Sequence, residues 1–219
     1  MKNIKFPICA ASLFILMSCV DLNLNPLSEG SSENWYSSQA EIEMSLNDFY
    51  RKEFFPIDDM MWGDDVTARN STSAINNGTL TSEDWTIASR WENYYKGIAR
   101  ALRIIKNMDR ARAMGVSEND ITQYEGEAYF YLGYAYGMLA FHWGDAILDK
   151  EGMSLDEAYT ASRSPKADVL AYSYECLDKA AERLPNTYPG IQRATKGAAY
   201  AFKARIAIYN EDYTVAAAA

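Results

Sequence analysis

The chain has 219 residues, of which 48% are apolar and 13% aromatic, and its formal net charge at pH 7 is −9. This length and composition exclude an intrinsically disordered chain and are sufficient for a domain with a substantial core. The acidic balance disfavours contact with nucleic-acid phosphates, so we expect no nucleic-acid partner.

Residues 1–18 have the pattern of a signal peptide. Lys2 and Lys5 make the start positive, and the run 6–17 that follows is apolar apart from Ser12. This run is too short for a membrane-spanning helix, which needs roughly 20 apolar residues, and it has the length of the apolar part of a signal peptide. We therefore predict that residues 1–18 direct export and are then removed.

The predicted signal peptide ends in a lipobox. In the stretch Leu16-Met17-Ser18-Cys19, an apolar residue stands three positions before the cysteine and a small residue directly before it. Cys19 is then the first mature residue and carries several acyl chains, which together anchor a protein stably in a membrane. The polar residues 19–33 are expected to form a flexible tether, so that residues 34–219 form the folded domain. The alternatives are an ordinary secretory signal with an incidental cysteine and an uncleaved anchor.

Beyond the tether, the sequence predicts an all-α fold. Apolar residues recur at spacings of three and four, the period of an amphipathic helix, and alternating strand patterns are few. Candidate caps mark where helices begin, namely Ser38 with Glu41, Ser117 with Asp120, Ser154 with Glu157, Ser164 before Pro165, and Thr195. The helices are predicted over residues 39–54, 90–114, 121–142, 166–184 and 195–210, with a short helix after Ser154.

One stretch has the spacing of a tetratricopeptide repeat. Residues 129–136 read Tyr-x-x-Leu-Gly-x-x-Tyr, as in the first helix of that repeat, and Ala180 and Pro185 match its second helix. Tyr129 and Pro185 lie 56 positions apart, about 28 more than within one repeat, which indicates a long insertion between the paired helices. The predicted fold is therefore a tetratricopeptide-like α-α superhelix with long loop insertions. A non-repeating helical bundle is the alternative.

Small residues are expected where neighbouring helices approach each other. We predict close contacts at Gly133 and Ala204, with the groove filled by the side chains of Tyr129, Leu132 and Tyr136. A further repeat is expected to begin at Thr195. Because the chain ends inside what would be the second helix of that repeat, we expect the domain to be incomplete at its C-terminus.

The chain has few groups for catalysis or metal binding. His142 is its single histidine, and Cys176 is the single cysteine of the predicted domain. A cluster of His and Cys metal ligands and a disulfide framework are therefore excluded, and a Ser-His-Asp arrangement would have to use His142. We expect His142 to be structural, Cys176 to be buried, and the protein to have no catalytic residue, metal or cofactor.

The segment 55–89 is the predicted region of ligand contact, because long loops on a rigid helical scaffold often carry function. It holds two tryptophans whose flat faces suit the apolar side of a sugar ring, and polar side chains that suit its hydroxyl groups. The candidate ligand-binding residues are Trp62, Asp64, Asp65, Arg69, Asn70 and Trp85. In the alternative, both tryptophans pack the loop against the helices. Adjacent acids rarely face each other across a sugar, as a glycosidase requires.

Five stretches of the chain resemble the SusD/RagB family of nutrient-binding outer-membrane lipoproteins, in that family's order and spacing. They are residues 31–50, 91–108, 126–148, 163–185 and 193–213. The strongest likeness is the third stretch, which is similar to the family's helix that ends in an aromatic-Gly-Asp turn. The chain departs from the family at Leu102, where Asn is frequent, and at Ala146, where a proline usually follows Gly-Asp. The likeness covers the N-terminal half of a typical member.

The resemblance implies a non-catalytic protein that is lipid-anchored in the outer membrane, displayed at the cell surface, and binds oligosaccharide. Some members of the family bind peptide instead. It also implies that the protein delivers its ligand to a TonB-dependent, SusC-like transporter, with the repeat face toward that partner. A tetratricopeptide-type scaffold lipoprotein that binds protein partners in the envelope is the alternative function.

Overall fold

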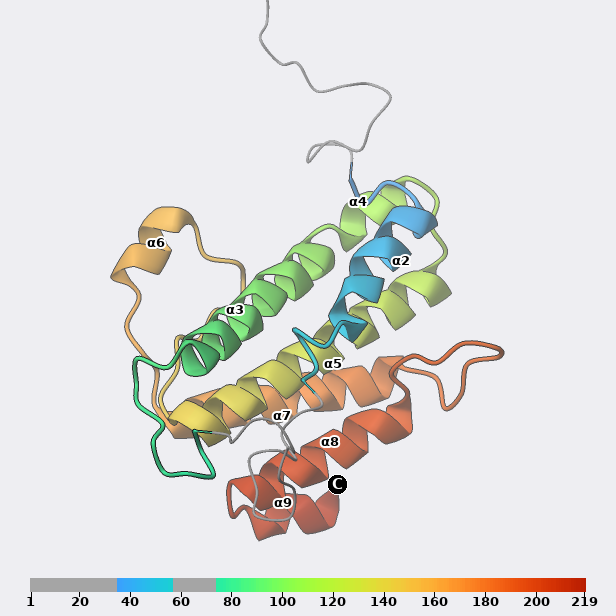
Figure 1. Ribbon diagram of the computed structural model, residues 1–219. Helices are drawn as coiled ribbons and strands as arrows, with labels where there is room; N and C mark the ends of the chain where they lie inside the picture. Colours follow the sequence, from blue (N-terminus) through green and yellow to red (C-terminus); the bar gives the residue numbers. More distant parts are fainter. Residues whose placement is uncertain (1–34, 57–73) are drawn as a thin grey trace, which may run out of the picture. The chain divides into compact units, whose positions relative to one another are not determined.

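The computed structural model describes residues 35–56 and 74–219, and these residues form helices and no strand (Figure 1). The predicted all-α fold is confirmed. The elements are α2 (Gln39–Asn47), η1 (Asp48–Tyr50), α3 (Trp85–Lys106), α4 (Met108–Ala113), α5 (Glu118–Trp143), α6 (Leu155–Thr160), α7 (Lys166–Arg183), α8 (Lys196–Tyr209) and α9 (Tyr213–Ala218).

Four of the predicted helix caps are confirmed. Ser38 and Ser154 each form a reciprocal capping box with the glutamate three positions later. The side chains of Ser117 and Thr195 accept hydrogen bonds from backbone N–H groups in the first turns of α5 and α8. Such caps satisfy donors that have no acceptor within the helix, which is why these residues mark the helix starts.

The predicted cap at Ser164 is wrong. The backbone of Ser164 pairs with that of Ala146, and Pro165 stands at the N-cap of α7 without a side-chain hydrogen bond. Instead, the Asp145 carboxylate accepts a hydrogen bond of 2.8 Å from the N–H of Lys166. The first turn of α7 is thus capped from the preceding loop, by a residue 21 positions earlier in the chain.

The helix predicted over residues 39–54 is shorter than its pattern indicated. Helix α2 ends at Asn47, and the chain continues through η1 into a tight turn. In this turn the Arg51 carbonyl accepts hydrogen bonds of 3.0 Å from the N–H groups of both Phe54 and Phe55. The two aromatic side chains are therefore presented by a turn rather than by a helix.

The helix predicted over residues 90–114 begins earlier and is divided in two. The Asp84 side chain caps α3 by accepting a hydrogen bond of 2.8 Å from the Thr86 N–H, so the first turn of α3 belongs to the segment predicted as a loop. Between α3 and α4, the Asn107 side chain donates to the Arg103 carbonyl at 2.7 Å. Side-chain hydrogen bonds of this kind compete with the regular helical ladder.

Helix α5 lies at the centre of the domain and packs against α3, α7 and α8 (Figure 1). Its residues are buried almost without interruption from 126 to 140. A helix that is covered on every side is apolar all round, because no face of it meets water. The aromatic-rich sequence of α5 therefore forms the core against which the other helices are arranged.

Gly133 lets α5 and α7 approach closely, as predicted. A Cβ atom at this position would lie 2.9 Å from the carbonyl oxygen of Ser173 in α7. The Ser173 hydroxyl donates a hydrogen bond of 2.6 Å to the Gly133 carbonyl across the same contact. Leu132 and Tyr136 are fully buried on either side, which confirms their predicted role.

Two of the other residues predicted at helix contacts are only partly buried. Ala204 is only partly buried, and the contact of α5 with α8 instead uses Gly137, against which the Ile206 side chain packs. Tyr129 is also only partly buried, and its ring lies 5.2 Å from each of two basic side chains of α7. The repeat spacing thus predicted the pairing of α5 with α7 correctly, and Tyr129 packs against the apolar cluster between these helices as predicted.

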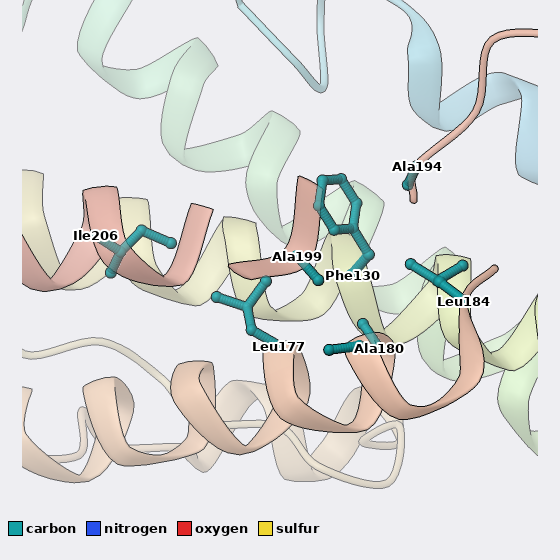
Figure 2. Packing of buried hydrophobic residues seen from close by; sticks show 8 residues of the cluster. Phe130, Leu177, Ala180, Leu184, Ala194, Ala199 and Ile206 are labelled. Carbon is teal, nitrogen blue, oxygen red and sulfur yellow. The ribbon is translucent and has the colours of Figure 1, made fainter. Parts of the chain in front are cut away.

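A cluster of buried apolar side chains joins α5, α7 and α8 (Figure 2). Its labelled members are Phe130, Leu177, Ala180, Leu184, Ala194, Ala199 and Ile206. The long helices α5, α7 and α8 thus pack side by side in their chain order, which fits the predicted tetratricopeptide-like scaffold. Helix α6 lies in the loop inserted between α5 and α7 and buries none of its residues, so the predicted insertion is confirmed.

Candidate functional site

Trp85 is the predicted ligand-binding residue that lies among the described residues. The others fall outside them, as do the predicted signal peptide, the tether and the lipidation site. These residues are Cys19, Trp62, Asp64, Asp65, Arg69 and Asn70.

Trp85 is the first residue of α3 and is 76% exposed. The alternative, in which this tryptophan packs against the helices, is therefore wrong for Trp85. Hydrogen bonds from the side chain and the backbone of Thr86 lower the pKa of Asp84, so the capping carboxylate is ionised at neutral pH. The indole is thus carried at a capped helix terminus, with an open face suited to stacking.

A pocket of about 350 Å³ lies beside Trp85. One wall is the N-terminal part of α3, and the other is the turn that follows η1. The residues that line it are Lys52, Glu53, Pro56, Trp85, Thr86, Ser89, Arg90 and Asn93. Hydroxyl, carboxamide and charged groups beside an aromatic face form the combination that binds the hydroxyl groups and the apolar side of a sugar.

The polar groups of the α3 wall were missed in the sequence, although a signal for them exists. Thr86, Ser89, Arg90 and Asn93 recur at spacings of three and four, so they share one face of the helix. If α3 is taken to begin at Trp85, the sequence shows a polar stripe on this helix directly after the tryptophan. The opposite wall carries no such signal, because the sequence predicted a helix where the turn lies.

The charged residues of this pocket differ in their surroundings. Arg90 is 7% exposed and is held within the α3 wall. The Glu53 carboxylate lies 3.3 Å from the Arg51 Nε atom, which partly compensates its charge, whereas Lys52 is exposed. The rim of the pocket thus offers both a hydrogen-bond donor and an acceptor to a neutral ligand.

A second pocket, of about 540 Å³, lies between α2 and the loop before α8. Its lining residues are Glu43, Asn47, Tyr50, Ile191, Gln192 and Arg193. Two of these lining residues, Tyr50 and Arg193, donate hydrogen bonds to the carboxylate of Glu127, which is 3% exposed. Burial raises the pKa of Glu127, while the Arg193 charge opposes this rise. Because these polar groups bond to one another, we interpret the network as structural.

His142 and Cys176 are both packed among other side chains of the domain. His142 is partly buried, and its ring centroid lies 4.9 Å from that of Phe141 and 5.5 Å from that of Trp143. Cys176 is fully buried as predicted, and burial raises the pKa of its thiol to about 12, so it is not a reactive thiolate. In residues 35–56 and 74–219, no group of three or more His, Cys, Asp or Glu side chains is placed to hold a metal ion.

Whether a helix can cross a membrane depends on its length and its apolar character. A span needs about 20 predominantly apolar residues. None of the helices within the described ranges combines sufficient length with sufficient apolar character.

Residues 29–208 match the model of the SusD-like family that is described as "Starch-binding associating with outer membrane". The chain belongs to the SusD-like family. The match covers most of the described domain and confirms the resemblance seen in the sequence. The residues that line the Trp85 pocket lie within the stretch that matches this family model.

Two SusD-like proteins of Formosa agariphila are similar to the chain. SusD-like protein P2 is 24% identical over 222 residues, which cover 94% of this chain and 43% of that protein. SusD-like protein P38 is 25% identical over 228 residues, which cover 98% of this chain and 44% of that protein. The chain therefore spans less than half the length of these curated relatives.

Solved SusD-like structures share the fold. A SusD-like protein of Bacteroides fragilis has a TM-score of 0.71 at 24% identity, covering 88% of this chain and 39% of that one. A SusD superfamily protein of Bacteroides vulgatus also has a TM-score of 0.71, at 23% identity and 83% and 42% coverage. A laminarin-binding SusD-like protein has a TM-score of 0.67 at 17% identity, again with 83% and 42% coverage.

Proposed function

We propose that this SusD-like protein is a non-catalytic glycan-binding protein, and that Trp85 and the pocket beside it contact an oligosaccharide. The observation that carries the proposal is the 76% exposed indole at the start of α3, next to a pocket lined by hydroxyl, carboxamide and charged groups. The indole face would stack on the CH groups of a sugar ring, and the polar groups would bind its hydroxyls. The proposed further contacts are Trp62, Asp64, Asp65, Arg69 and Asn70.

The names of similar proteins support a carbohydrate ligand. The family description names starch, one similar structure is of a laminarin-binding protein, and another was solved with xylogluco-oligosaccharide. These are different glycans. We therefore propose oligosaccharide as the ligand class and not one particular sugar.

Isothermal titration calorimetry against soluble starch, laminarin and xyloglucan oligosaccharides tests this proposal. Trp85→Ala is expected to weaken binding at least fivefold, which corresponds to about 1 kcal/mol. Tyr159→Ala is the matched control, because Tyr159 is 81% exposed on α6 and does not line the pocket. Unchanged binding in Trp85→Ala would contradict this site, and a wild-type chain that binds no glycan would contradict the function.

The absence of catalysis is a separate part of the proposal. Incubation of the protein with the same glycans is expected to release no new reducing ends. Hydrolysis that disappears on substitution of Asp64 or Asp65 would instead indicate a glycoside hydrolase.

We also propose that Cys19 is lipidated, that the protein is displayed on the outer membrane, and that it delivers its ligand to a TonB-dependent, SusC-like transporter. The family description, which names association with the outer membrane, supports this placement. Affinity purification from detergent-solubilised outer membranes is expected to recover such a transporter together with the protein. Recovery of the protein without a transporter would contradict the proposed partner.

A scaffold that binds protein partners is the second candidate function, and α6 is the feature that favours it. Leu155 and Tyr159 are 70% and 81% exposed, and the helix buries none of its residues. Neighbouring apolar side chains that remain in water are typical of contact surfaces. A Leu155→Asp variant that loses a protein partner while the chain binds no glycan would favour this function over the first.

A further inference from the structure

Phe55 connects the turn after η1 to two helices that lie far away in the sequence. Its ring centroid lies 4.5 Å from that of Tyr134 and 5.9 Å from that of Phe130, both in α5. It lies 6.5 Å from the ring centroid of Phe202 in α8. Aromatic pairs at such separations stabilise a contact beyond the area that they bury. The ring therefore ties the turn to the face shared by α5 and α8.

The neighbours of Phe55 in the chain form one wall of the Trp85 pocket. Lys52, Glu53 and Pro56 line that pocket across from α3. Phe55 does not line it and instead lines two separate pockets together with residues of α5 and α8. The turn thus has one side toward the proposed glycan pocket and an aromatic anchor toward the core.

Phe54 also holds this turn to α5, because its ring centroid lies 6.0 Å from that of Tyr131. The N–H groups of Phe54 and Phe55 are bonded within the turn, to the Arg51 carbonyl. The Phe54 ring lies beneath the Arg100 guanidinium, with 4.8 Å to the centroid, and so holds the turn to α3. The Phe55 ring adds the contact of the turn with α8.

We propose that Phe55 is a positioning residue for the glycan pocket, and that its ring fixes the wall formed by residues 52–56 relative to Trp85. The proposal rests on the proposed function, since it assigns a role within the same pocket. A binding wall that is already ordered does not have to be ordered by the ligand, so the binding free energy is not reduced by that cost. Phe55 acts on affinity through the turn and without touching the glycan.

Two variants and one control separate this role from a general effect on packing. Phe55→Ala removes the anchoring ring, whereas Phe55→Leu retains an apolar side chain that fills much of the same space. Phe141→Ala is the matched control, because Phe141 also stacks on an aromatic ring of α8, at 4.8 Å from the Tyr209 centroid. It has no part in the pocket wall.

Hydrogen–deuterium exchange of the peptide covering residues 51–56 measures the order of the wall without any ligand. Phe55→Ala is expected to raise its exchange rate at least tenfold while the peptides of α5 remain protected, which shows that the domain is folded. In calorimetry the same variant is expected to weaken glycan binding at least fivefold. Phe55→Leu is expected to remain within about threefold of wild type, and Phe141→Ala within about twofold.

Exchange that is unchanged in Phe55→Ala would overturn the proposal, whatever the glycan affinity. Faster exchange with unchanged affinity would overturn it as well, while a loss of binding in Trp85→Ala would keep the proposed function in place. A wild-type chain that binds no glycan would remove the proposed function and this role together, and that failure is visible before any variant is made.

Discussion

Arg193 and Glu127 form a buried ion pair between the loop before α8 and the centre of α5. The Arg193 Nη1 atom lies 2.7 Å from the Glu127 Oε2 atom, and the two side chains are 11% and 2% exposed. The Tyr50 hydroxyl donates to the same carboxylate oxygen at 2.8 Å and accepts the Ala194 N–H at 2.9 Å. One carboxylate thus joins three segments that are remote in the sequence.

Loss of the arginine from this ion pair should strongly lower the stability of the domain. Arg193→Ala leaves the buried Glu127 carboxylate without its partner, and we expect the free energy of unfolding to fall by about 3–5 kcal/mol. Lys96→Ala is the control, because it breaks an ion pair with Glu92 whose side chains are 54% and 61% exposed, and it should cost less than about 1 kcal/mol. Urea denaturation followed by circular dichroism measures both values. Similar losses in the two variants would show that burial of the pair is not decisive.

The contact of α5 with α7 should not accept a larger residue at Gly133. Because a Cβ atom there would press on the Ser173 carbonyl, Gly133→Ala is expected to lower the free energy of unfolding by about 1–3 kcal/mol. Gly197→Ala in α8 is the matched control, since a Cβ atom there meets nothing closer than 4.0 Å. It should raise stability by roughly 0.5–1 kcal/mol, because alanine favours the helix. Thermal unfolding of both variants tests the expected opposite signs.

Tyr95 should make stability depend on pH in alkaline solution. Burial raises the pKa of Tyr95 from 10.0 to about 12, and its hydroxyl donates to the Ile147 carbonyl at 2.9 Å. A group whose pKa is higher in the folded state stabilises fully below its unfolded pKa, and this contribution is lost as pH rises from about 10 to about 12.

Tyr95→Phe isolates this contribution from those of the other tyrosines. At pH 7 the variant should be about 1 kcal/mol less stable than wild type, because a hydrogen bond is lost. Urea denaturation at pH 7, 10 and 11.5 should show this difference shrinking above pH 10. A difference that stays constant over this range would contradict the assigned pKa.

The predicted lipid anchor depends on one cysteine. Cys19→Ala should leave the protein without acyl groups, so that intact-mass measurement shows no lipid and the membrane fraction loses the protein. Cys176→Ala is the control and should leave the anchor unchanged, because Cys176 is fully buried in the domain. Retention of Cys19→Ala in the membrane fraction would contradict lipidation at this position.

The helix starts were predictable because a cap is a local contact. Ser38, Ser117, Ser154 and Thr195 each bond to a backbone N–H three positions later, so the pattern that predicts the cap contains the whole interaction. The start of α7 was not predictable in this way, because its acceptor, Asp145, comes from an inserted loop.

Only part of the candidate site was predictable from the sequence. Trp85 was identified because the sequence placed it in a functional loop, yet its exposure depends on the start of α3. Lys52 and Glu53 were missed, because the apolar pattern of residues 39–54 extends beyond the point where the helix gives way to a turn. Nothing within that segment indicates that it faces α3.

The sequence by itself determined that the domain is helical, where most helices begin, that Gly133 lies at a close helix contact, and which family the chain resembles. These features depend on periodic patterns and on contacts within about one helical turn. Only the tertiary structure decided the two walls of the Trp85 pocket, the anchoring of Phe55 on α5 and α8, and the pairing of Glu127 with Arg193, which lie 66 positions apart. Such contacts join remote segments, and whether a polar side chain is buried depends on every segment that surrounds it.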